Sequence, residues 1–267
     1  MFRRCFKERN AGLEEQIEKW VRDATLLMKR VNLPVYLPEW AYRGLRSVRR
    51  GLHNSSSTKT NLSGDREVEW SFIISRLPQG PGQALDFGAS FGNLSIAAAR
   101  CGLHVLAIDL EPERFPWKHE NVDFLCADLL KAELPEKSFD VIMNCSAVEH
   151  VGLRGRYGVA VEESDGDLAA MRKFRDLLKL SGTMLMTIPC GQDAAIAPWH
   201  RVYGPQRLPK LLAGFDVKEE EYWSKPSENR WQLSSKESAL AYPPTGHPTD
   251  PTLCSYAIGC FVLARNG

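Results

Sequence analysis

One short segment of the sequence combines an acidic residue with glycines at the end of a predicted strand. In ALDFGASFGNLSIAAAR, residues 84–100, Asp86 is followed by Gly88 and Gly92, with Ser90 between them. Glycines lack a Cβ, so a ligand can approach this backbone closely, and the following helix would present its first N–H groups there. A carboxylate at this point repels a dianionic pyrophosphate and attracts a cation such as a sulfonium or an ammonium. The turn therefore favours a positively charged cofactor.

Further polar residues follow the next three predicted strands. Asp109 ends HVLAID, about 20 residues after the turn, where a carboxylate suits a pair of ribose hydroxyls. The third and fourth predicted strands of the chain lie in VDFLCADLL and FDVIMNCSAVEHV. The remaining candidate cofactor residues are Leu110, which follows Asp109, and, in these two segments, Ala127, Asp128, Leu129, Asn144, Cys145 and Ser146.

These segments resemble the cofactor-binding motifs of class I S-adenosylmethionine-dependent methyltransferases. DFGASFG is similar to the first motif of that family, in which an acidic residue precedes three glycines at alternate positions, and it departs from the pattern at Ser90. The resemblance covers roughly residues 68–190. It implies that S-adenosylmethionine is the cofactor, with Asp109 on the ribose, Asp128 on the adenine amine and residues 144–146 beside the methionine moiety.

Two histidines are candidate catalytic bases. His150 follows the fourth predicted strand and is expected to open a helix with Glu149, and His200 follows the fifth strand. Methyl transfer to a hydroxyl needs an aligned acceptor and a group that takes up its proton, and histidine exchanges protons near neutral pH. A structural hydrogen bond is the alternative role for each histidine.

Three residues beside the two histidines and one tryptophan farther along the chain are candidates for binding the acceptor. They are Glu149, Arg201, Tyr203 and Trp231, which offer hydrogen-bonding groups and aromatic faces. The segment PWHRVYGPQRL is similar to methyltransferases of bacterial surface-glycan and natural-product biosynthesis, which implies a small-molecule or sugar acceptor. Packing in the core is the alternative role for the aromatic residues. An acidic cluster at 162–167 starts a predicted helix, where carboxylates complement the helix dipole, and we expect no metal there.

The elements that position these residues alternate between strand and helix. Strands are predicted at 84–87, 104–109, 123–127, 140–145 and 183–188, and helices at 65–77, 93–102, 167–180 and 205–213. This alternation predicts an α/β fold with a Rossmann-like, seven-stranded, mostly parallel sheet and helices on both faces. Strands at 215–223 and 255–265 should pair antiparallel at one edge. The irregular stretch 224–252 between them is long enough to suggest a lid or substrate loop.

Residues 1–64 are expected to form a helical N-terminal extension and linker before a catalytic domain at 65–267. Residues 12–31 place apolar side chains at helical spacing, and the surrounding basic residues leave open a lid, a homodimer surface or a membrane-proximal foot. The overall net charge of +1 gives no reason to expect nucleic acid as a partner. The seven cysteines lack metal-ligand spacing, and neither a signal peptide nor a membrane-spanning run is visible, so we expect a cytoplasmic enzyme.

Two other functions remain open at this point. A nicotinamide-dependent Rossmann oxidoreductase would need G-x-G-x-x-G after the first strand, and the sequence lacks it. A non-catalytic, methyltransferase-like partner subunit is the other alternative, and Ser90 in the turn is the feature that keeps it open.

Overall fold

The computed structural model describes residues 60–155, 157, 162–226, 228–247 and 250–266. The predicted N-terminal extension, apart from residues 60–64, and the roles considered for it therefore lie outside the described residues. Within the described part, Leu62 is buried, and its N–H donates to the carbonyl of Thr252. The described end of the predicted linker is thus packed on the domain that follows.

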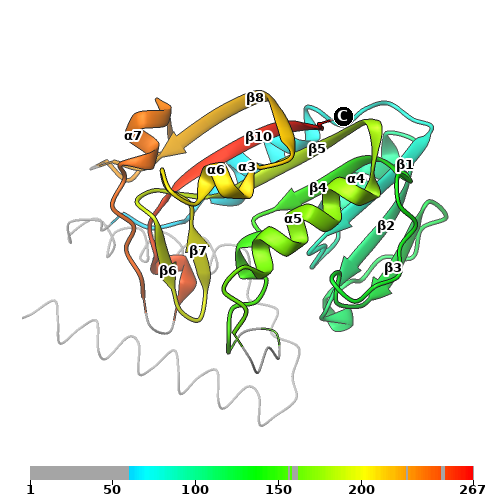
Figure 1. Cartoon of the computed structure of the whole chain (residues 1–267), viewed down its shortest axis with the longest axis horizontal. Coiled ribbons are helices and arrows are strands. Elements are labelled where there is room, and N and C mark those ends of the chain that lie inside the picture. Colours follow the sequence, from blue (N-terminus) through cyan, green and yellow to red (C-terminus); the bar gives the residue numbers. More distant parts are fainter. Residues whose placement is uncertain (1–59, 156, 158–161, 227, 248–249, 267) are drawn as a thin grey trace, which may run out of the picture. The chain divides into compact units, whose positions relative to one another are not determined.

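One mixed sheet forms the centre of the domain (Figure 1). Its strand order is β3-β2-β1-β4-β5-β10-β8-β9. The five parallel strands are β1 (Gly82–Phe87), β2 (Leu103–Asp109), β3 (Val122–Cys126), β4 (Phe139–Cys145) and β5 (Leu178–Cys190). β8 (Phe215–Ser224), β9 (Gln232–Ser234) and β10 (Ala257–Arg265) continue the sheet antiparallel. The predicted α/β, Rossmann-like architecture with an antiparallel edge is confirmed, but the sheet has eight strands rather than seven.

Each face of the sheet carries its own hydrophobic core. Helices α3 (Asp65–Ile74) and α4 (Asn93–Arg100) pack on one face, where Phe72, Ile73 and Ala98 are buried. Helices α5 (Gly166–Leu177), α6 (Leu208–Leu211) and α7 (Lys236–Leu240) bury residues such as Phe174 on the other. Strands covered on both sides need apolar side chains on both sides, which is why the centres of β1 (Ala84 and Leu85) and β4 (Val141–Met143) are apolar and buried.

The structure differs from the predicted elements in three places. The helix predicted at 167–180 ends at Leu177, because Leu178 already begins a 13-residue β5. A hairpin of β6 (Ala194–Ile196) and β7 (His200–Val202) follows β5, where no strand is predicted. The stretch predicted as irregular, 224–252, contains β9 and α7 and ends within the short helix η3 (Pro251–Leu253).

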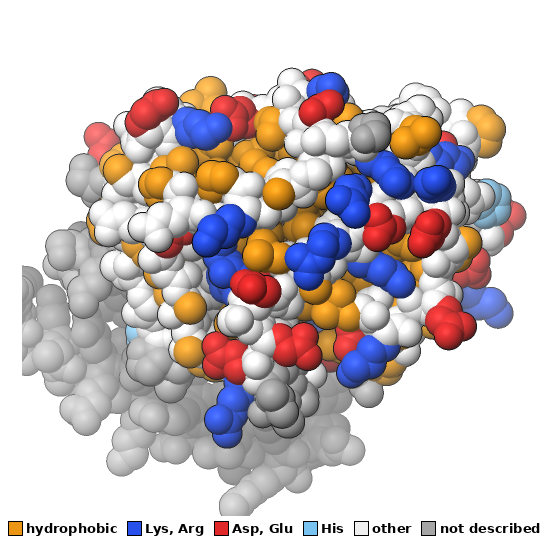
Figure 2. All heavy atoms as spheres, viewed as in Figure 1, with side chains coloured by type: hydrophobic (Ala, Val, Ile, Leu, Met, Phe, Trp, Pro, Cys, Tyr) orange, Lys and Arg blue, Asp and Glu red, His pale blue; other side chains and the backbone are white. Residues whose placement is uncertain are grey.

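The molecular surface over α5 and α6 mixes charges of both signs. Figure 2 shows basic and acidic side chains alternating across this face, with apolar side chains between them. In the part of the chain that the structure describes, no helix combines the length and the apolar character needed to cross a bilayer.

Candidate functional site

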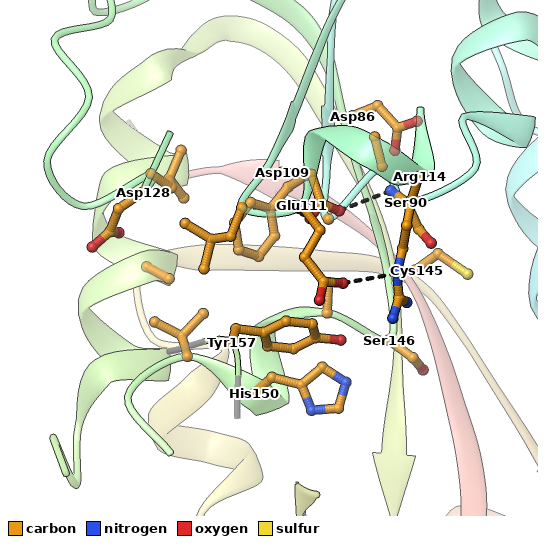
Figure 3. Close-up of a pocket in the computed structure, with 18 of the residues that line it drawn as sticks. Asp86, Ser90, Asp109, Glu111, Arg114, Asp128, Cys145, Ser146, His150 and Tyr157 are labelled. Carbon is orange, nitrogen blue, oxygen red and sulfur yellow. Dashed lines mark hydrogen bonds and ion pairs between the residues drawn. The ribbon is translucent and has the colours of Figure 1, made fainter. Parts of the chain in front are cut away.

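A cavity of about 880 Å³ opens at the carboxyl ends of β1, β2, β3 and β4. These ends meet at one edge because the four strands are parallel and paired in register. Figure 3 shows Asp86, Ser90 and Asp109 toward one end of the cavity and His150 and Tyr157 toward the other. Of the predicted cofactor residues, ten line it, namely Asp86, Gly88, Ser90, Asp109, Leu110, Ala127, Asp128, Leu129, Cys145 and Ser146.

The turn after β1 adopts left-handed backbone at alternate residues. Gly88, Ser90 and Gly92 have φ values of +68°, +47° and +67°. A Cβ on Gly88 would lie 2.5 Å from the Cβ of Ala147, so this position requires glycine for space as well as for conformation. Ser90 occupies the conformation that a glycine would favour and keeps the turn closed despite its side chain. Ser90 is thus the non-glycine residue of the three left-handed positions in this turn.

Gly92 has a different role from the one that the sequence suggests. It does not line the cavity, and a Cβ there would come within 2.5 Å of Phe115 and 2.7 Å of Trp117. The indole N–H of Trp117 donates to the carbonyl of Phe91 at 2.6 Å. Gly92 thus lets the segment after β2 fold against the turn.

Asp86 is a buried carboxyl group at the edge of the cavity. It is 2% exposed, and its Oδ2 accepts a 2.5 Å hydrogen bond from the Ser95 hydroxyl. Burial raises the pKa of Asp86 to about 6, because a charge is costly away from water, although the Ser95 hydrogen bond opposes this effect. A cationic ligand group beside Asp86 would favour its ionised form.

Asp109 connects the end of β2 to the turn after β1. Its Oδ2 accepts from the Ser90 N–H at 2.8 Å, and its Oδ1 accepts from the Glu111 N–H at 3.0 Å (Figure 3). These bonds fix the orientation of the carboxylate, and each oxygen retains a second lone pair for a ligand hydroxyl. Glu111 also pairs with Arg114 at 2.8 Å within the cavity lining.

The residues after β3 form the next part of the wall. Ala127, Asp128 and Leu129 line the cavity, and Oδ1 of Asp128 accepts from the Leu130 N–H at 3.0 Å. The other carboxylate oxygen lies 3.1 Å from Nζ of Lys131, whose side chain is mostly exposed. Asp128 is therefore held by its own loop at the cavity edge.

The three residues at the end of β4 that are predicted as cofactor contacts lie in different surroundings. Cys145 and Ser146 line the cavity, whereas Asn144 is fully buried outside the lining. Its amide donates to the Thr187 carbonyl at 3.2 Å and accepts from the Val148 N–H at 2.9 Å. Asn144 thus ties β4 to β5 and to the following turn, which is a structural role that differs from the predicted contact with the cofactor.

Helix α3 contributes a cluster to the site that the sequence analysis misses. Arg66 and Trp70, one helical turn apart, both line the cavity, and Glu69 lies beneath them at 1% exposure. The Glu69 carboxylate accepts from Nη1 of Arg66 at 2.6 Å, from Oγ1 of Thr187 at 3.0 Å and from the hydroxyl of Ser146. The arrangement of Arg66 and Trp70 at i and i+4 in DREVEW is the signal from which this face could have been found.

His150 lies in the cavity wall on a 3-10 helix, η2 (Val148–His150), rather than on the α-helix expected after β4. Its Nδ1 is 2.5 Å from the Trp199 carbonyl oxygen. A carbonyl only accepts hydrogen bonds, so Nδ1 carries a proton and Nε2 is the basic nitrogen of the neutral ring. Glu149 is buried outside the lining, with Oε1 3.7 Å from Nε2 of His150, and it does not reach the cavity as the predicted acceptor contact. The Tyr157 ring lies 5.9 Å from the imidazole.

The β6–β7 hairpin and the residue after it place the second candidate base, His200, and two predicted acceptor residues, Arg201 and Tyr203, outside the cavity lining. His200 is buried, with its ring 4.9 Å from the Tyr256 ring. Arg201 is 4% exposed and donates to the carbonyls of Glu149, Val151, Glu163 and Ser164. Tyr203 donates to Asp167 at 3.0 Å, and burial raises the pKa of this phenol, so it remains neutral. The predicted acceptor contacts of Arg201 and Tyr203 are thus replaced by contacts that hold the wall in place.

The stretch 224–252 does not contribute a described residue to the cavity lining. The indole N–H of Trp231 donates to the Ser63 carbonyl at 3.1 Å, on the segment before α3. Tyr242 donates to the Lys225 carbonyl at 2.9 Å, and the indole N–H of Trp199 donates to the His247 carbonyl at 2.8 Å. Over its described residues this stretch packs on its neighbours rather than over the site.

The acidic cluster at 162–167 is divided between the cavity and an ion-pair network. Glu163 lines the cavity, while Asp167 is fully buried and accepts from Arg207 at 2.5 and 2.9 Å. Within the described residues, no group of three or more His, Cys, Asp or Glu side chains has an arrangement that could hold a metal ion.

Comparison with known proteins gives a matching family model and many similar solved structures. The family model described as "Caenorhabditis protein of unknown function, DUF268" matches residues 113–245. A search of curated proteins finds no match.

Three solved structures illustrate the structural similarity. A 1,6-didemethyltoxoflavin-N1-methyltransferase from Burkholderia thailandensis, solved with 1,6-didemethyltoxoflavin and S-adenosylhomocysteine, is 16% identical, with a TM-score of 0.48 over 88% of this chain and 93% of that chain. The N-methyltransferase NodS from Bradyrhizobium japonicum, solved with S-adenosylhomocysteine, is 15% identical, with a TM-score of 0.49 over 83% and 98%. A putative S-adenosylmethionine-dependent methyltransferase from Listeria monocytogenes is 14% identical, with a TM-score of 0.49 over 74% and 98%. This chain is thus similar to each of them over most of its length at low sequence identity.

Proposed function

We propose that this chain is a methyltransferase that takes its methyl group from S-adenosylmethionine and transfers it to a hydroxyl oxygen of a small-molecule or glycan acceptor. One observation carries the proposal: a buried carboxyl group, Asp86, adjoins a turn of left-handed backbone inside a large cavity at the carboxyl ends of parallel strands. Ligands of open parallel sheets bind at this edge. A donor with a sulfonium and an ammonium supplies the positive charge that such a carboxyl group favours.

Several residues of the cavity suit chemical groups of the donor. Asp109 is oriented by two backbone N–H groups and can accept from ribose hydroxyls, and Asp128 can accept from an exocyclic amine at the next strand end. Leu110, Ala127 and Leu129 supply apolar contacts beside them. When bound, S-adenosylmethionine supplies an electrophilic methyl group that an acceptor oxygen displaces in line.

The acceptor would lie at the opposite end of the cavity, against His150 and Tyr157. The Trp199 carbonyl holds the proton of His150 on Nδ1, so Nε2 takes up the hydroxyl proton of the acceptor. Trp70 and Val151 line the cavity with apolar surface that excludes water from the reacting groups. A polar hydroxyl and a ring that packs on Tyr157 or Trp70 are the features that we expect of the acceptor.

Calorimetry with S-adenosylhomocysteine, the product form of the donor, tests the cofactor. We expect binding by the wild type and a loss of about tenfold or more in Asp109→Asn, because a hydrogen-bonding partner of the ribose is weakened. Asp123→Asn is the matched control, since Asp123 is an exposed carboxylate on β3 that does not line the cavity. Wild-type protein that binds no S-adenosylhomocysteine would refute the proposal.

A methyl-transfer assay tests the reaction itself. Labelled S-adenosylmethionine is incubated with a panel of phenols, sugars and matched amines, and His150→Gln is compared with the wild type. We expect transfer to hydroxyl acceptors, and a fall of roughly 100-fold or more in the variant with S-adenosylhomocysteine affinity unchanged within about twofold. Binding without transfer to any acceptor would instead favour a non-catalytic partner subunit.

A further inference from the structure

Arg66 differs from the other cations that line the cavity. Arg114 pairs with Glu111 and Lys131 pairs with Asp128, and each of these pairs lies along the cavity lining itself. Arg66 instead pairs with Glu69, which is buried beneath it at 1% exposure, while the Arg66 side chain remains 44% exposed. The guanidinium of Arg66 therefore presents its charge to the cavity, with its counter-charge behind it.

The guanidinium is anchored on one side only. Its Nη1 donates to Glu69 at 2.6 Å and to the sulfur of Cys145 at 3.5 Å. Within the described part of the chain, Nε and Nη2 make no hydrogen bond, and these two N–H groups form the planar fork that binds a carboxylate in two-point contact. The anchored edge thus orients the fork for a ligand.

The residues around Glu69 fix the orientation of the Arg66–Glu69 pair. Glu69 also accepts from Thr187 and Ser146, so the carboxylate that holds Arg66 is itself fixed by β5 and by the turn after β4. Burial raises the pKa of the Cys145 thiol, with the nearby Glu69 carboxylate adding to the effect, so the thiol stays neutral. Arg66 is then the cation beside residues 145–146, whereas the carboxylates of Asp86, Asp109 and Asp128 lie around the rest of the cavity.

We propose that Arg66 is a binding residue for a carboxylate, which it holds through Nε and Nη2 at the α3 side of the cavity. The inference rests on the proposed function for the identity of the ligand. The carboxylate at the amino-acid end of the methyl donor and a carboxylate on the acceptor share this chemistry. Two experiments distinguish the donor from the acceptor as the source of the carboxylate.

The first experiment compares two nucleosides by calorimetry. S-adenosylhomocysteine carries the amino-acid end, and 5′-methylthioadenosine has the same nucleoside and thioether without it. Arg66→Met should lower the affinity for S-adenosylhomocysteine by about 10- to 100-fold and leave 5′-methylthioadenosine within about twofold, because only the former loses a charged hydrogen-bonding partner. Arg66→Lys, which keeps the pair with Glu69, should show a smaller loss of the same kind.

Arg76→Met is the matched control. Arg76 follows the C-terminal end of α3, pairs with Glu219 at 2.9 Å and lies outside the cavity, so its replacement makes the same change of charge at the other end of the helix. Affinity for 5′-methylthioadenosine shows in the same titrations that each variant is folded. If Arg66→Met loses its affinity for 5′-methylthioadenosine, the double variant Arg66→Met, Glu69→Gln is measured in its place. Glu69→Gln removes the buried carboxylate that the single variant leaves unpaired.

The second experiment tests the acceptor as the source. Protein saturated with S-adenosylhomocysteine is titrated with benzoate and with benzyl alcohol, its neutral counterpart. Benzoate binding that is lost in Arg66→Met but kept in Arg76→Met assigns the carboxylate to the acceptor. The inference is overturned if the Arg66→Met substitution, alone or combined with Glu69→Gln, changes neither the S-adenosylhomocysteine affinity nor benzoate binding, or if the double variant still weakens both nucleosides equally. Wild-type protein that binds neither nucleoside refutes the proposed function instead.

Discussion

Nδ1 of His150 lies 2.5 Å from the carbonyl oxygen of Trp199. Trp199 precedes β7, so the hairpin fixes the tautomer of a histidine that lies on another part of the chain. We predict that the neutral His150 ring is protonated at Nδ1 rather than at Nε2. Two-bond ¹⁵N–¹H NMR correlations, assigned with His150→Gln, measure this directly. A neutral ring protonated mainly at Nε2 would contradict the role of His150 as a base through that nitrogen.

The strained serine in the turn after β1 gives a prediction about stability. Ser90 has φ of +47°, where an L-residue costs about 1–2 kcal/mol, so Ser90→Gly should raise the free energy of unfolding by about 0.5–1 kcal/mol after the added entropy of the unfolded chain. Its N–H still donates to Asp109, so S-adenosylhomocysteine affinity should not fall.

Denaturant unfolding measures the effect, with Ser71→Gly as the control of opposite sign. Ser71 is an exposed residue inside α3, where the same substitution should lower stability by about 0.5 kcal/mol. Loss of stability in Ser90→Gly would show that the serine side chain contributes more than its backbone conformation costs.

The strand ends of the site could be predicted from sequence because local patterns determine them. An apolar run followed by Asp86 or Asp109 gives both the strand and its end, and parallel pairing brings these ends to one edge. The contacts of α3 could not be predicted in this way. Arg66 is 79 residues from Cys145, and Glu69 is 118 residues from Thr187, so only the assembled fold brings them together.

The residues at 200–203 show a second limit of sequence patterns. His200, Arg201 and Tyr203 have side chains suited to catalysis and binding, and the sequence therefore suggests a site. The hairpin formed by 194–202 and the residue that follows it turn these side chains into the core. There they contact the 149–167 region or Tyr256, which precedes β10. Residue type alone does not show whether a polar side chain hydrogen-bonds to a ligand or to a buried carbonyl of the protein.

The contact between Gly88 and Ala147 predicts a specific pattern of destabilisation and rescue. Gly88→Ala places a Cβ 2.5 Å from the Ala147 Cβ and should lower the free energy of unfolding by about 2–4 kcal/mol, from overpacking and left-handed strain together. Adding Ala147→Gly removes the clash but leaves the backbone strain, so the double variant should recover part of the loss. Unfolding of the four proteins in a double-mutant cycle measures this coupling, and strict additivity would contradict the contact.

The buried carboxyl group of Asp86 predicts how stability changes with pH. Its pKa is raised from 3.8 to about 6, so the native state binds the proton more tightly than the unfolded state. This contribution to stability is fully present below about pH 4 and is lost as the pH rises through 6. Relative to Asp86→Asn, the wild type should therefore lose up to about 3 kcal/mol between pH 4 and pH 7. Urea unfolding at several pH values checks it, and parallel curves for the two proteins would contradict it.

Ligand binding should offset part of the free-energy cost of ionising the buried Asp86. A cationic ammonium beside Asp86 favours the ionised carboxylate, so we expect the affinity for S-adenosylhomocysteine to rise between pH 5 and pH 7 with release of a proton. Asp86→Asn should bind more weakly and with little pH dependence over this range. Calorimetry in buffers of different ionisation enthalpy counts the proton, and wild-type binding that releases none would argue against this pairing.

Arg201 leads to the last prediction, because its guanidinium connects both ends of the segment 149–164. Nη1 donates to the carbonyls of Glu149 and Val151 at 3.2 and 2.6 Å, and Nη2 donates to those of Glu163 and Ser164 at 3.0 and 3.4 Å. Arg201→Met leaves these carbonyls without their charged donor. We expect the wall of the cavity to open locally more often, while the strands that carry the cofactor residues keep their stability.

Hydrogen exchange separates this local effect from general destabilisation. The N–H groups of Leu153 and Glu163 close the segment by donating to His150 and Gly152, and their exchange should accelerate by about tenfold or more in Arg201→Met. Amides of β1 and β4 should change far less. Arg265→Met is the control, because Arg265 donates to a single carbonyl, that of Leu178, away from the cavity. Equal acceleration throughout the described domain would make Arg201 a general support of the fold, whereas selective acceleration makes it the residue that positions the wall beside His150.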